Sequence, residues 1–376
     1  MNPWATHSRG RLADLRLPTT EDQRLTRYTP HMTSNLLRAA VIGLGAMGAN
    51  HARVYAEIDG VELAAVADTD AARVDAAVRG RGVRGYDDYR RMLAEERIDL
   101  LTVAVPTRAH LDVAAQVIEC GVPLLVEKPL AATMAEGERL RDLAAAARVP
   151  LTVGHIERFN PAVVELQARL RAGELGRVFQ MHARRVGPFP ERVRDVGVVL
   201  DLAPHDIDVM RFLLDSEVVR VQAETEQRIN TEHEDMLAGV LRFANGVVGV
   251  LDINWLTPTK IRELSVLGER GMFVVDYLAR ELTFYENAHH SAADAQPADW
   301  AARHLIGVSE GSVHKIPIER REPLRVELEA FVRAVRNGTP VPVTADDGLA
   351  AMAAAEALVR AAESGTSVRL PMEARA

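Results

Sequence analysis

Short apolar runs alternate with segments of helical periodicity over residues 36–154. The runs predict buried strands, and the segments between them, where apolar residues recur every three or four positions, predict helices. We expect strands at 39–42, 61–67, near 83, 100–105, 123–126 and 151–153, and helices at 46–58, 70–78, 86–95, 109–120 and 134–148. Strands that alternate with helices of about 10–15 residues predict a doubly wound parallel sheet, an α/β fold.

The pattern changes after residue 154. Helices are expected over 161–171 and roughly 200–214, followed by strand-like runs with little helix between them. These runs lie at 178–185, 218–227, 236–243, 247–254, 262–268, 272–276 and 281–285. Asn245-Gly246 between two apolar runs is a hairpin signal. We therefore expect a second, α+β domain over 155–321 with a mostly antiparallel sheet.

The remaining segments complete the expected domain organisation. Residues 287–312 are polar and irregular and are expected to form a surface loop, and two helices, at 324–336 and 348–363, are expected to close the chain. We expect residues 322–376 to pack back on the first domain. Residues 1–35 lack periodicity, which predicts a disordered extension or a true start at Met32.

Composition excludes several classes of protein. The 376 residues suit two domains, and the net charge of −8 argues against non-specific binding to nucleic acid. No apolar run reaches the roughly 18 residues that a membrane helix needs. The single cysteine, Cys120, excludes an intramolecular disulfide. Together with the lack of a secretory signal, this favours the cytoplasm and excludes a membrane partner.

The first expected strand runs directly into a glycine motif, Gly43-Leu44-Gly45-Ala46-Met47-Gly48. In this G-x-G-x-x-G pattern the first glycine permits a tight turn, and the second lets backbone approach a pyrophosphate. The third lets the helix pack on the strand. The N–H groups at the helix start, those of Ala46, Met47 and Gly48, suit phosphate. The motif predicts a dinucleotide site.

Residues that follow other strands of this domain extend the predicted cofactor site. Asp68 ends the second strand, 20 residues after Gly48, which suits a carboxylate on the ribose hydroxyls. Its charge would repel a 2′-phosphate, so NAD is favoured over NADP, although Arg73 could offset that charge. We also assign Thr69, Pro106, Thr107, His110 and Glu127 to the cofactor site. For His110, a role in capping and packing its helix remains an equal alternative.

Four features of the chain resemble the Gfo/Idh/MocA oxidoreductases over nearly its whole length from Arg38. They are the glycine motif, Glu127-Lys128-Pro129, Asp201-Leu202-Ala203-Pro204-His205 and the closing Glu322-Pro323-Leu324 helix. The resemblance implies a Rossmann domain followed by an open-faced sheet domain, with oligomer contacts through the sheet. We therefore expect a homodimer or homotetramer.

A finer resemblance, to UDP-N-acetylglucosamine 3-dehydrogenases, is carried by four strings. They are Gly154-His155-Ile156-Glu157-Arg158-Phe159-Asn160-Pro161, Arg185-Val186-Gly187-Pro188-Phe189-Pro190, Asp195-Val196-Gly197-Val198 and Asn254-Trp255-Leu256-Thr257-Pro258-Thr259-Lys260. These enzymes oxidise the C3 hydroxyl of a sugar nucleotide. The resemblance implies a sugar or sugar-nucleotide substrate.

Oxidation of an alcohol requires a base at the hydroxyl and stabilisation of the developing oxygen charge. His205 is the expected base, because imidazole titrates near neutral pH. Asp201 lies four residues earlier and would share its face if the segment is helical. Pro204, however, predicts that the helix begins there. Lys128, at the end of a strand, would bind the reacting oxygen and also contact the cofactor.

Candidate substrate ligands are basic or polar residues of the second domain, since a diphosphate must be met by local positive charge. They are Arg158, Asn160, Arg184, Arg185, Trp255 and Lys260, with Arg192, Arg194 and Arg262 as further cations. Each could instead be a solvated, salt-bridged or core residue. His289, His290, His304 and His314 fit no common zinc spacing, so no metal is expected.

Two alternatives remain open at this point. A dehydrogenase of inositols or of free or phosphorylated sugars would share every catalytic residue and need no diphosphate site. A non-catalytic NAD-binding sensor would need no proton-transfer residues, so the presence of Lys128, Asp201 and His205 argues against it.

Overall fold

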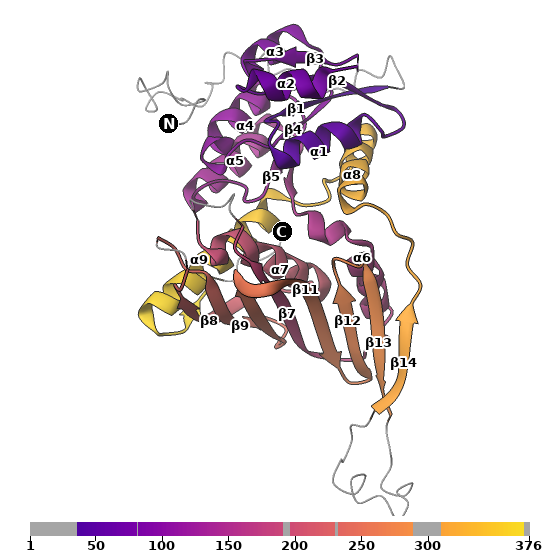
Figure 1. Cartoon of the computed structure of the whole chain (residues 1–376), viewed down its shortest axis with the longest axis vertical. Helices are drawn as coiled ribbons and strands as arrows, with labels where there is room; N and C mark the ends of the chain where they lie inside the picture. Colours follow the sequence, from indigo (N-terminus) through magenta and orange to yellow (C-terminus); the bar gives the residue numbers. More distant parts are fainter. Residues whose placement is uncertain (1–35, 81, 191–195, 230–231, 289–309, 372–376) are drawn as a thin grey trace, which may run out of the picture. The chain divides into compact units, whose positions relative to one another are not determined.

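The computed structural model describes residues 36–80, 82–190, 196–229, 232–288 and 310–371. They form two compact units (Figure 1): one extends to Ile156 and includes Leu324–Leu349, and the other comprises Glu157–Pro323 and the chain from Ala350 onward. The expected extension over residues 1–35 lies outside the described residues. In the described chain, no helix has the length and apolar content needed to cross a membrane.

The first unit contains a six-stranded, all-parallel sheet. Its strands are β1 (Leu37–Ile42), β2 (Val61–Ala67), β3 (Arg84–Tyr86), β4 (Leu100–Val103), β5 (Leu124–Glu127) and β6 (Leu151–Gly154). The strands lie in the spatial order β3-β2-β1-β4-β5-β6. From β1 the chain builds the sheet outward to one side as far as β3 and then crosses over to build the other side from β4, so the switch point lies between β1 and β4. In such sheets, ligands bind outside the carboxyl ends of the strands at this switch point. The predicted doubly wound sheet is confirmed.

Three helices of the first unit begin at a residue whose side chain caps them. The unit contains α1 (Ala46–Tyr55), α2 (Ala71–Val78), α3 (Tyr89–Glu95), α4 (His110–Glu119), α5 (Met134–Ala147) and α8 (Pro323–Asn337), with a 3₁₀ turn, η1, at Thr107–Ala109. The Asp70, Asp88 and Thr133 side chains accept a backbone N–H in the first turn of α2, α3 and α5. Leu328 and Phe331 of α8 are fully buried in one core with Val41 and Tyr55.

The second unit is built on a nine-stranded sheet in the order β14-β13-β12-β11-β7-β10-β9-β8-β15. These strands are β7 (Val178–Pro188), β8 (Val218–Glu226), β9 (Met236–Phe243), β10 (Val248–Asn254), β11 (Leu256–Gly268), β12 (Gly271–Asp276), β13 (Glu281–Asn287), β14 (Glu310–Ile316) and β15 (Val368–Arg369). All described pairs are antiparallel except β7 with β10, so the mostly antiparallel sheet is confirmed.

Two strands of this sheet were not expected. β14 begins inside the segment expected to be a loop, and it pairs with β13, so that prediction is wrong for 310–312. β15 pairs with β8 through only Val368 and Arg369. Both strands are held by pairing with distant residues, which local polarity does not reveal. Residues 289–309 of the expected loop lie outside the described chain.

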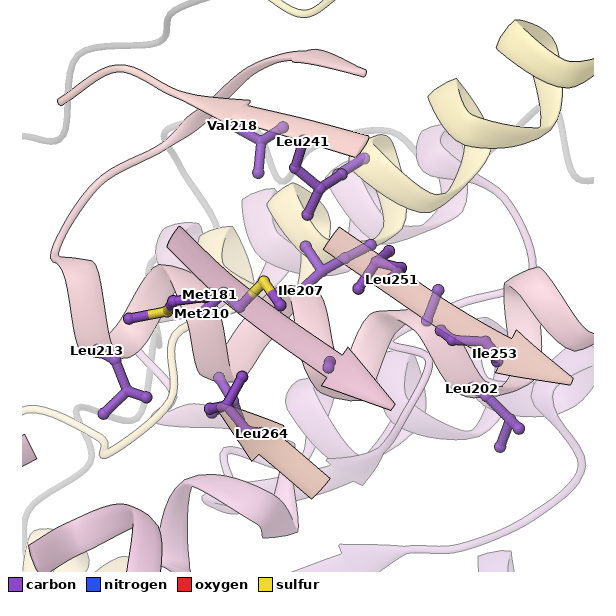
Figure 2. Close-up of a cluster of buried hydrophobic side chains, with 14 of the residues drawn as sticks. Met181, Leu202, Ile207, Met210, Leu213, Val218, Leu241, Leu251, Ile253 and Leu264 are labelled. Carbon is purple, nitrogen blue, oxygen red and sulfur yellow. The ribbon is translucent and has the colours of Figure 1, made fainter. Parts of the chain in front are cut away.

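Helices cover one face of the nine-stranded sheet. After a 3₁₀ turn, η2 (Ile156–Phe159), come α6 (Pro161–Arg171) and α7 (Val198–Leu214), which share one apolar core with the sheet. Figure 2 shows Ile207 and Met210 of α7 beside Met181 of β7 and Leu251 of β10. Because side chains alternate along a strand, Leu251 and Ile253 face α7 while Val250 and Asp252 belong to the opposite face.

The last helix, α9 (Ala345–Ser364), corrects the expected domain organisation. Ala354, Leu358 and Ala361 are buried in the core of the second unit. Leu358 lies against β9 at Gly239, where a side chain would crowd it at 3.3 Å. The expectation that both closing helices pack on the first domain is therefore wrong for α9 from Ala350 onward. The start of α9, up to Leu349, and α8 from Leu324 belong to the first unit.

Helix α7 passes through Pro204 instead of beginning there. A proline inside a helix costs roughly 3 kcal/mol through one lost hydrogen bond and a clash. Here the loss falls in the second turn, and nearly every residue that follows is buried. Burial of an apolar side chain contributes about 1.5–3 kcal/mol, so packing along the helix outweighs the proline.

Candidate cofactor and catalytic site

The glycine motif forms a tight turn between β1 and α1. Gly43 has φ +90°, and a side chain there would lie 2.5 Å from the Ala104 carbonyl oxygen. A side chain at Gly48 would overlap the Gly43 carbonyl oxygen. At Gly45, in contrast, no atom lies within 4 Å of the position of a Cβ. Two glycines thus permit close packing, and the third leaves space above the turn.

That space suits the pyrophosphate of a dinucleotide. Gly45 is the N-cap of α1, no side chain caps the helix, and its first turn contains no acidic residue. The N–H groups at Ala46, Met47 and Gly48 and the helix dipole therefore favour an anion there. The residues present fit the phosphate part of NAD.

Asp68 ties the end of β2 to the glycine turn. Its carboxylate accepts the Leu44 N–H at 2.6 Å and the Asp70 N–H at 2.9 Å, and its side chain is 8% exposed. Arg73 lies 3.8 Å from Asp68 and 3.3 Å from Asp70, so it pairs with both carboxylates. Thr69 follows at the exposed end of the strand. The negative charge predicted beside the adenosine ribose is thus present at the carboxyl edge of the sheet.

The predicted cofactor residues that follow β4 differ in their exposure to solvent. Pro106 is exposed and Thr107 half-buried. His110 is buried, with Nε2 3.0 Å from the Val105 carbonyl oxygen and Nδ1 2.9 Å from that of Pro129. Burial lowers the pKa of His110 even though these carbonyls favour the charged ring. The structure supports packing of His110 between two loops and does not support its assignment to the cofactor.

Lys128 directly follows β5 at the carboxyl edge of the parallel sheet and is half-buried. Glu127 accepts the Lys128 backbone N–H at 3.2 Å and lies 2.7 Å from Nε2 of His51 on α1. Burial favours a raised pKa for Glu127, but the His51 hydrogen bond and the Lys128 charge outweigh it and lower the pKa. The strand therefore ends on an anchored carboxylate followed by a cation.

Asp201 and His205 lie four residues apart on α7, so they share one face of the helix. Both are half-buried, whereas residues 206–211 are all buried. Although Pro204 lies between them, Asp201 and His205 are therefore on the same helix. The second unit presents a carboxylate and an imidazole on one face of α7.

Arg158 and Asn160 have structural partners within the second unit. Both ends of the Arg158 guanidinium bind Asp208 of α7, at 2.7 and 2.6 Å, and the pair is buried. Asn160 caps α6 through the Ala162 N–H and donates to the Tyr277 carbonyl oxygen. Because these contacts occupy their polar groups away from solvent, the structure does not support their assignment as substrate ligands.

Arg185 makes a second buried arrangement against α7. Its guanidinium donates to both carboxylate oxygens of Asp206, at 2.7 and 3.0 Å, and to Glu157 at 3.2 Å. Burial alone would lower the pKa of Arg185, but the charges of Asp206 and Glu157 outweigh burial and raise this pKa above its ordinary value. With Arg158 it sets the rotation of α7 from both sides of His205. Arg185 is thus a scaffold residue in the structure, which does not support its assignment as a substrate ligand.

Arg184 points away from α7. It belongs to the opposite face of β7 and pairs there with Asp252 at 3.4 Å, with a half-exposed side chain. Strand alternation places the two adjacent arginines on opposite faces of the sheet, so the structure does not support the assignment of Arg184 as a substrate ligand.

Arg262 of β11 lies directly across from Arg185 and so faces α7. Its Nη1 donates to the Val186 and Ile261 carbonyl oxygens at 2.7 and 2.9 Å. Burial and the like charge of Arg185 lower the pKa of Arg262 to about 10, while Asp201 is among the carboxylates that counter this. Arg262 is half-buried, and its guanidinium is fixed by two backbone carbonyls.

Trp255 lies between β10 and β11, and Lys260 belongs to an irregular part of β11. Trp255 is 2% exposed and packs edge-on against Phe189, with ring centroids 5.2 Å apart, so the core alternative holds for it. The register of β11 against β7 shifts between Leu256 and Ile261, which places exposed Lys260 on the bulged segment. Lys260 remains a candidate substrate ligand.

The residues described show no cluster of three or more metal-ligating side chains. His314 lies on β14, 3.8 Å from Glu286, whereas His289, His290 and His304 fall outside the described chain, as do Arg192 and Arg194.

Sequence reasoning missed the residues that hold the site in place. His51, Asp206 and Asp208 were not singled out, because their partners are distant in the chain. One local signal existed: His51 and Tyr55 are four residues apart on the buried stripe of α1, beginning at Gly48. A polar pair on a buried stripe requires partners from elsewhere.

Comparison with known proteins agrees with this geometry. Residues 37–155 match the sequence model described as "Oxidoreductase family, NAD-binding Rossmann fold", and residues 163–274 match the "GFO/IDH/MocA C-terminal domain". The chain is 30% identical over 305 residues to a UDP-N-acetylglucosamine 3-dehydrogenase of Acidithiobacillus ferrooxidans, covering 81% of this chain and 90% of that one.

Two further relatives bear on the range of the family. An inositol 2-dehydrogenase of Saccharopolyspora erythraea is 30% identical over 347 residues, covering 89% of this chain and 95% of that one. The solved Acidithiobacillus enzyme superposes with a TM-score of 0.75 at 28% identity, covering 87% of this chain and 98% of that one.

The fold and the site thus define an NAD-binding oxidoreductase. The chain belongs to the Gfo/Idh/MocA family.

The three glycines should respond differently to alanine. Gly45→Ala should leave thermal stability unchanged and weaken NAD binding at least tenfold, because its methyl group enters empty space that the pyrophosphate needs. Gly48→Ala should lower the melting temperature, since its methyl group overlaps backbone. Calorimetric titration with NAD and thermal denaturation measure both effects. Gly82→Ala, in open surroundings, is the control. Tight NAD binding by Gly45→Ala would contradict the assignment.

The adjacent arginines of β7 provide a matched test of the scaffold. Arg185→Ala should lower the free energy of unfolding by about 3–5 kcal/mol, because it leaves the buried Asp206 charge without its arginine partner. Arg184→Ala should cost less than about 0.5 kcal/mol, since its ion pair is exposed. Urea unfolding of each variant gives both values, and Arg185→Met with Asp206→Leu should recover part of the loss. Equal losses at the two positions would show that Arg185 is not a scaffold residue.

Proposed function

We propose that the protein oxidises a sugar hydroxyl to a ketone by hydride transfer to NAD, with C3 of UDP-N-acetylglucosamine or a related UDP-sugar as the favoured position. The observation that carries this proposal is the end of β5, where Lys128 follows an anchored Glu127 at the carboxyl edge of a sheet whose glycine turn fits NAD. Ligands of open parallel sheets bind along that edge.

In this proposal each half of the reaction has a residue. The glycine turn and Asp68 would hold NAD, which would supply the acceptor for the hydride of the substrate carbon. His205 removes the hydroxyl proton, and Asp201, one turn earlier on the same face, orients the imidazole or the substrate. Lys128 donates a hydrogen bond to the reacting oxygen and stabilises its developing negative charge. None of these roles requires a metal ion.

A sugar nucleotide brings negative charge that this acidic protein must meet locally. Arg262 supports such a substrate, because its guanidinium is fixed by two carbonyls and faces the same side of the sheet as α7. Exposed Lys260 lies two residues earlier on the bulge. Together with the similarity to the Acidithiobacillus enzyme, these cations favour a UDP-sugar over a free polyol.

The second candidate is an inositol or a free or phosphorylated sugar. It is favoured by the similarity to the inositol 2-dehydrogenase, which extends over a larger share of this chain at the same identity. All catalytic residues would keep their roles, and only the cations at Arg262 and Lys260 would lose their diphosphate partner. A non-catalytic sensor is disfavoured, because it would not need a carboxylate and an imidazole, Asp201 and His205, on one face of a helix.

A substrate panel tests the proposal. Purified protein with NAD or NADP should form reduced cofactor, measured by absorbance, with a UDP-sugar and not with myo-inositol, glucose or glucose 6-phosphate. Lys128→Ala and His205→Asn should each lower kcat by about 10²–10⁴-fold, the usual contribution of acid–base residues, with NAD affinity unchanged.

Each alternative predicts a distinct result in the same assay. Turnover of inositol or glucose would assign the second candidate and retain the catalytic residues. Near-normal kcat in either variant would contradict the roles given to Lys128 and His205. Arg333→Ala, at an exposed ion pair on α8, is the control and should keep its kcat.

We also propose that the protein is a homo-oligomer that pairs through the sheet face opposite α7. A row of cross-strand neighbours on that face runs from β10 to β14 through Val248, Gln180, Leu267, Met272, Tyr285 and Val313. Leu267, Tyr285 and Val313 are large, apolar and exposed. Beside them Arg184, Asp252 and Glu263 provide both signs of charge, as a self-complementary two-fold contact requires.

Leu267→Glu should therefore shift the protein toward the monomer, because it places charge within the apolar row. Sedimentation velocity over a concentration series measures the change. Val164→Glu, an exposed apolar position on α6, is the control and should not alter the assembly. A monomeric wild-type protein would disprove this contact.

A further inference from the structure

A chain of buried polar side chains connects α1 to the end of β5. Nε2 of His51 lies 2.7 Å from Glu127 Oε1, and its Nδ1 lies 3.4 Å from the Thr102 hydroxyl on β4. The Tyr55 hydroxyl lies 3.0 Å from the same Thr102 oxygen. His51, Thr102 and Tyr55 are completely buried, so this chain is excluded from water.

With a neutral imidazole and an ionised Glu127, one arrangement of protons satisfies all three contacts. The Glu127 carboxylate only accepts hydrogen bonds, so Nε2 of His51 carries the proton. Nδ1 then accepts from the Thr102 hydroxyl, and Thr102 in turn accepts from Tyr55. Every donor points toward Glu127. In low-dielectric surroundings such a satisfied chain is rigid, and an unsatisfied member of it is costly.

Two hydrogen bonds hold Glu127, and Gly154 lies beside its carboxylate. His51 binds one carboxylate oxygen, and the Lys128 backbone N–H binds the other. On the neighbouring strand β6, a side chain at Gly154 would lie only 3.1 Å from that second oxygen. The carboxylate thus fills a site that admits one orientation, directly before Lys128.

We propose that His51 is a positioning residue for Lys128: it fixes the Glu127 carboxylate, which in turn fixes the backbone from which the lysine projects. This inference rests on the catalytic role proposed for Lys128. A hydrogen bond to the reacting oxygen is effective only in correct geometry, and a misplacement of about 1 Å can cost on the order of 10²-fold in rate. The lowered pKa of Glu127 agrees with a carboxylate held in its charged form.

Two substitutions of His51 separate positioning from simple packing. In His51→Gln the amide can reach the place of Nε2 and donate to Glu127, whereas the shorter side chain of His51→Asn cannot. We expect kcat of His51→Asn to fall about 10²-fold and that of His51→Gln to stay within about fivefold of wild type. The KM for substrate and the Kd for NAD should change less than threefold in both. Similar losses in the two variants would overturn the proposal.

A double-mutant cycle with Lys128→Ala tests whether His51 acts through the lysine. If it does, His51→Asn combined with Lys128→Ala should be no slower than Lys128→Ala alone. Multiplied losses would show that His51 acts by another route. If Lys128→Ala alone is fully active, the proposed function fails; if only His51→Asn is fully active, this inference alone fails.

Thr102→Val keeps the test decisive should His51→Asn not fold. It removes the hydroxyl that donates to Nδ1 while keeping the shape of the side chain, so the imidazole is free to move its proton from Nε2. We expect about a tenfold lower kcat with unchanged NAD affinity, and no further loss in the Lys128→Ala background. An unchanged kcat in Thr102→Val would overturn the proposal.

Discussion

The close approach of α1 to the end of β1 is the constraint on which the first unit depends. It requires Gly48, because any side chain there would overlap the Gly43 carbonyl oxygen. The same approach places the start of α1 over open space at Gly45, and three residues beyond Gly48 it brings His51 to Glu127. One packing contact thus defines both the phosphate site and the support of Lys128.

In the second unit, the corresponding constraint is electrostatic. Two buried arginines each donate two hydrogen bonds to an aspartate of α7: Arg158 binds Asp208, and Arg185 binds Asp206. Such pairs add little stability over apolar residues, but they admit few alternative geometries. Here they set the rotation of a helix that presents Asp201 and His205 on one face. The polar interior of this unit therefore serves orientation more than stability.

Several substrate residues could not be assigned from the sequence, because it does not show which face of the sheet each arginine occupies. Arg184 and Arg185 are adjacent, yet strand alternation places one on the open face and the other under α7. Arg262, which pairs across from Arg185, became a stronger candidate than any of the assigned arginines only when the register was known. Likewise, α8 and α9 both carry buried apolar side chains, and the core that each helix joins depends on distant residues.

The sequence by itself determined the parallel sheet, most element boundaries, the glycine turn and the positions of Lys128, Asp201 and His205. These are local properties: hydrophobic period, caps and the lack of a side chain at particular glycines. Tertiary structure alone decided the route of α7 through Pro204, the pairing of β14 and β15, and the partners of His51, Arg158 and Arg185. Each of these depends on the free energy of contacts between residues far apart in the chain, which no local pattern encodes.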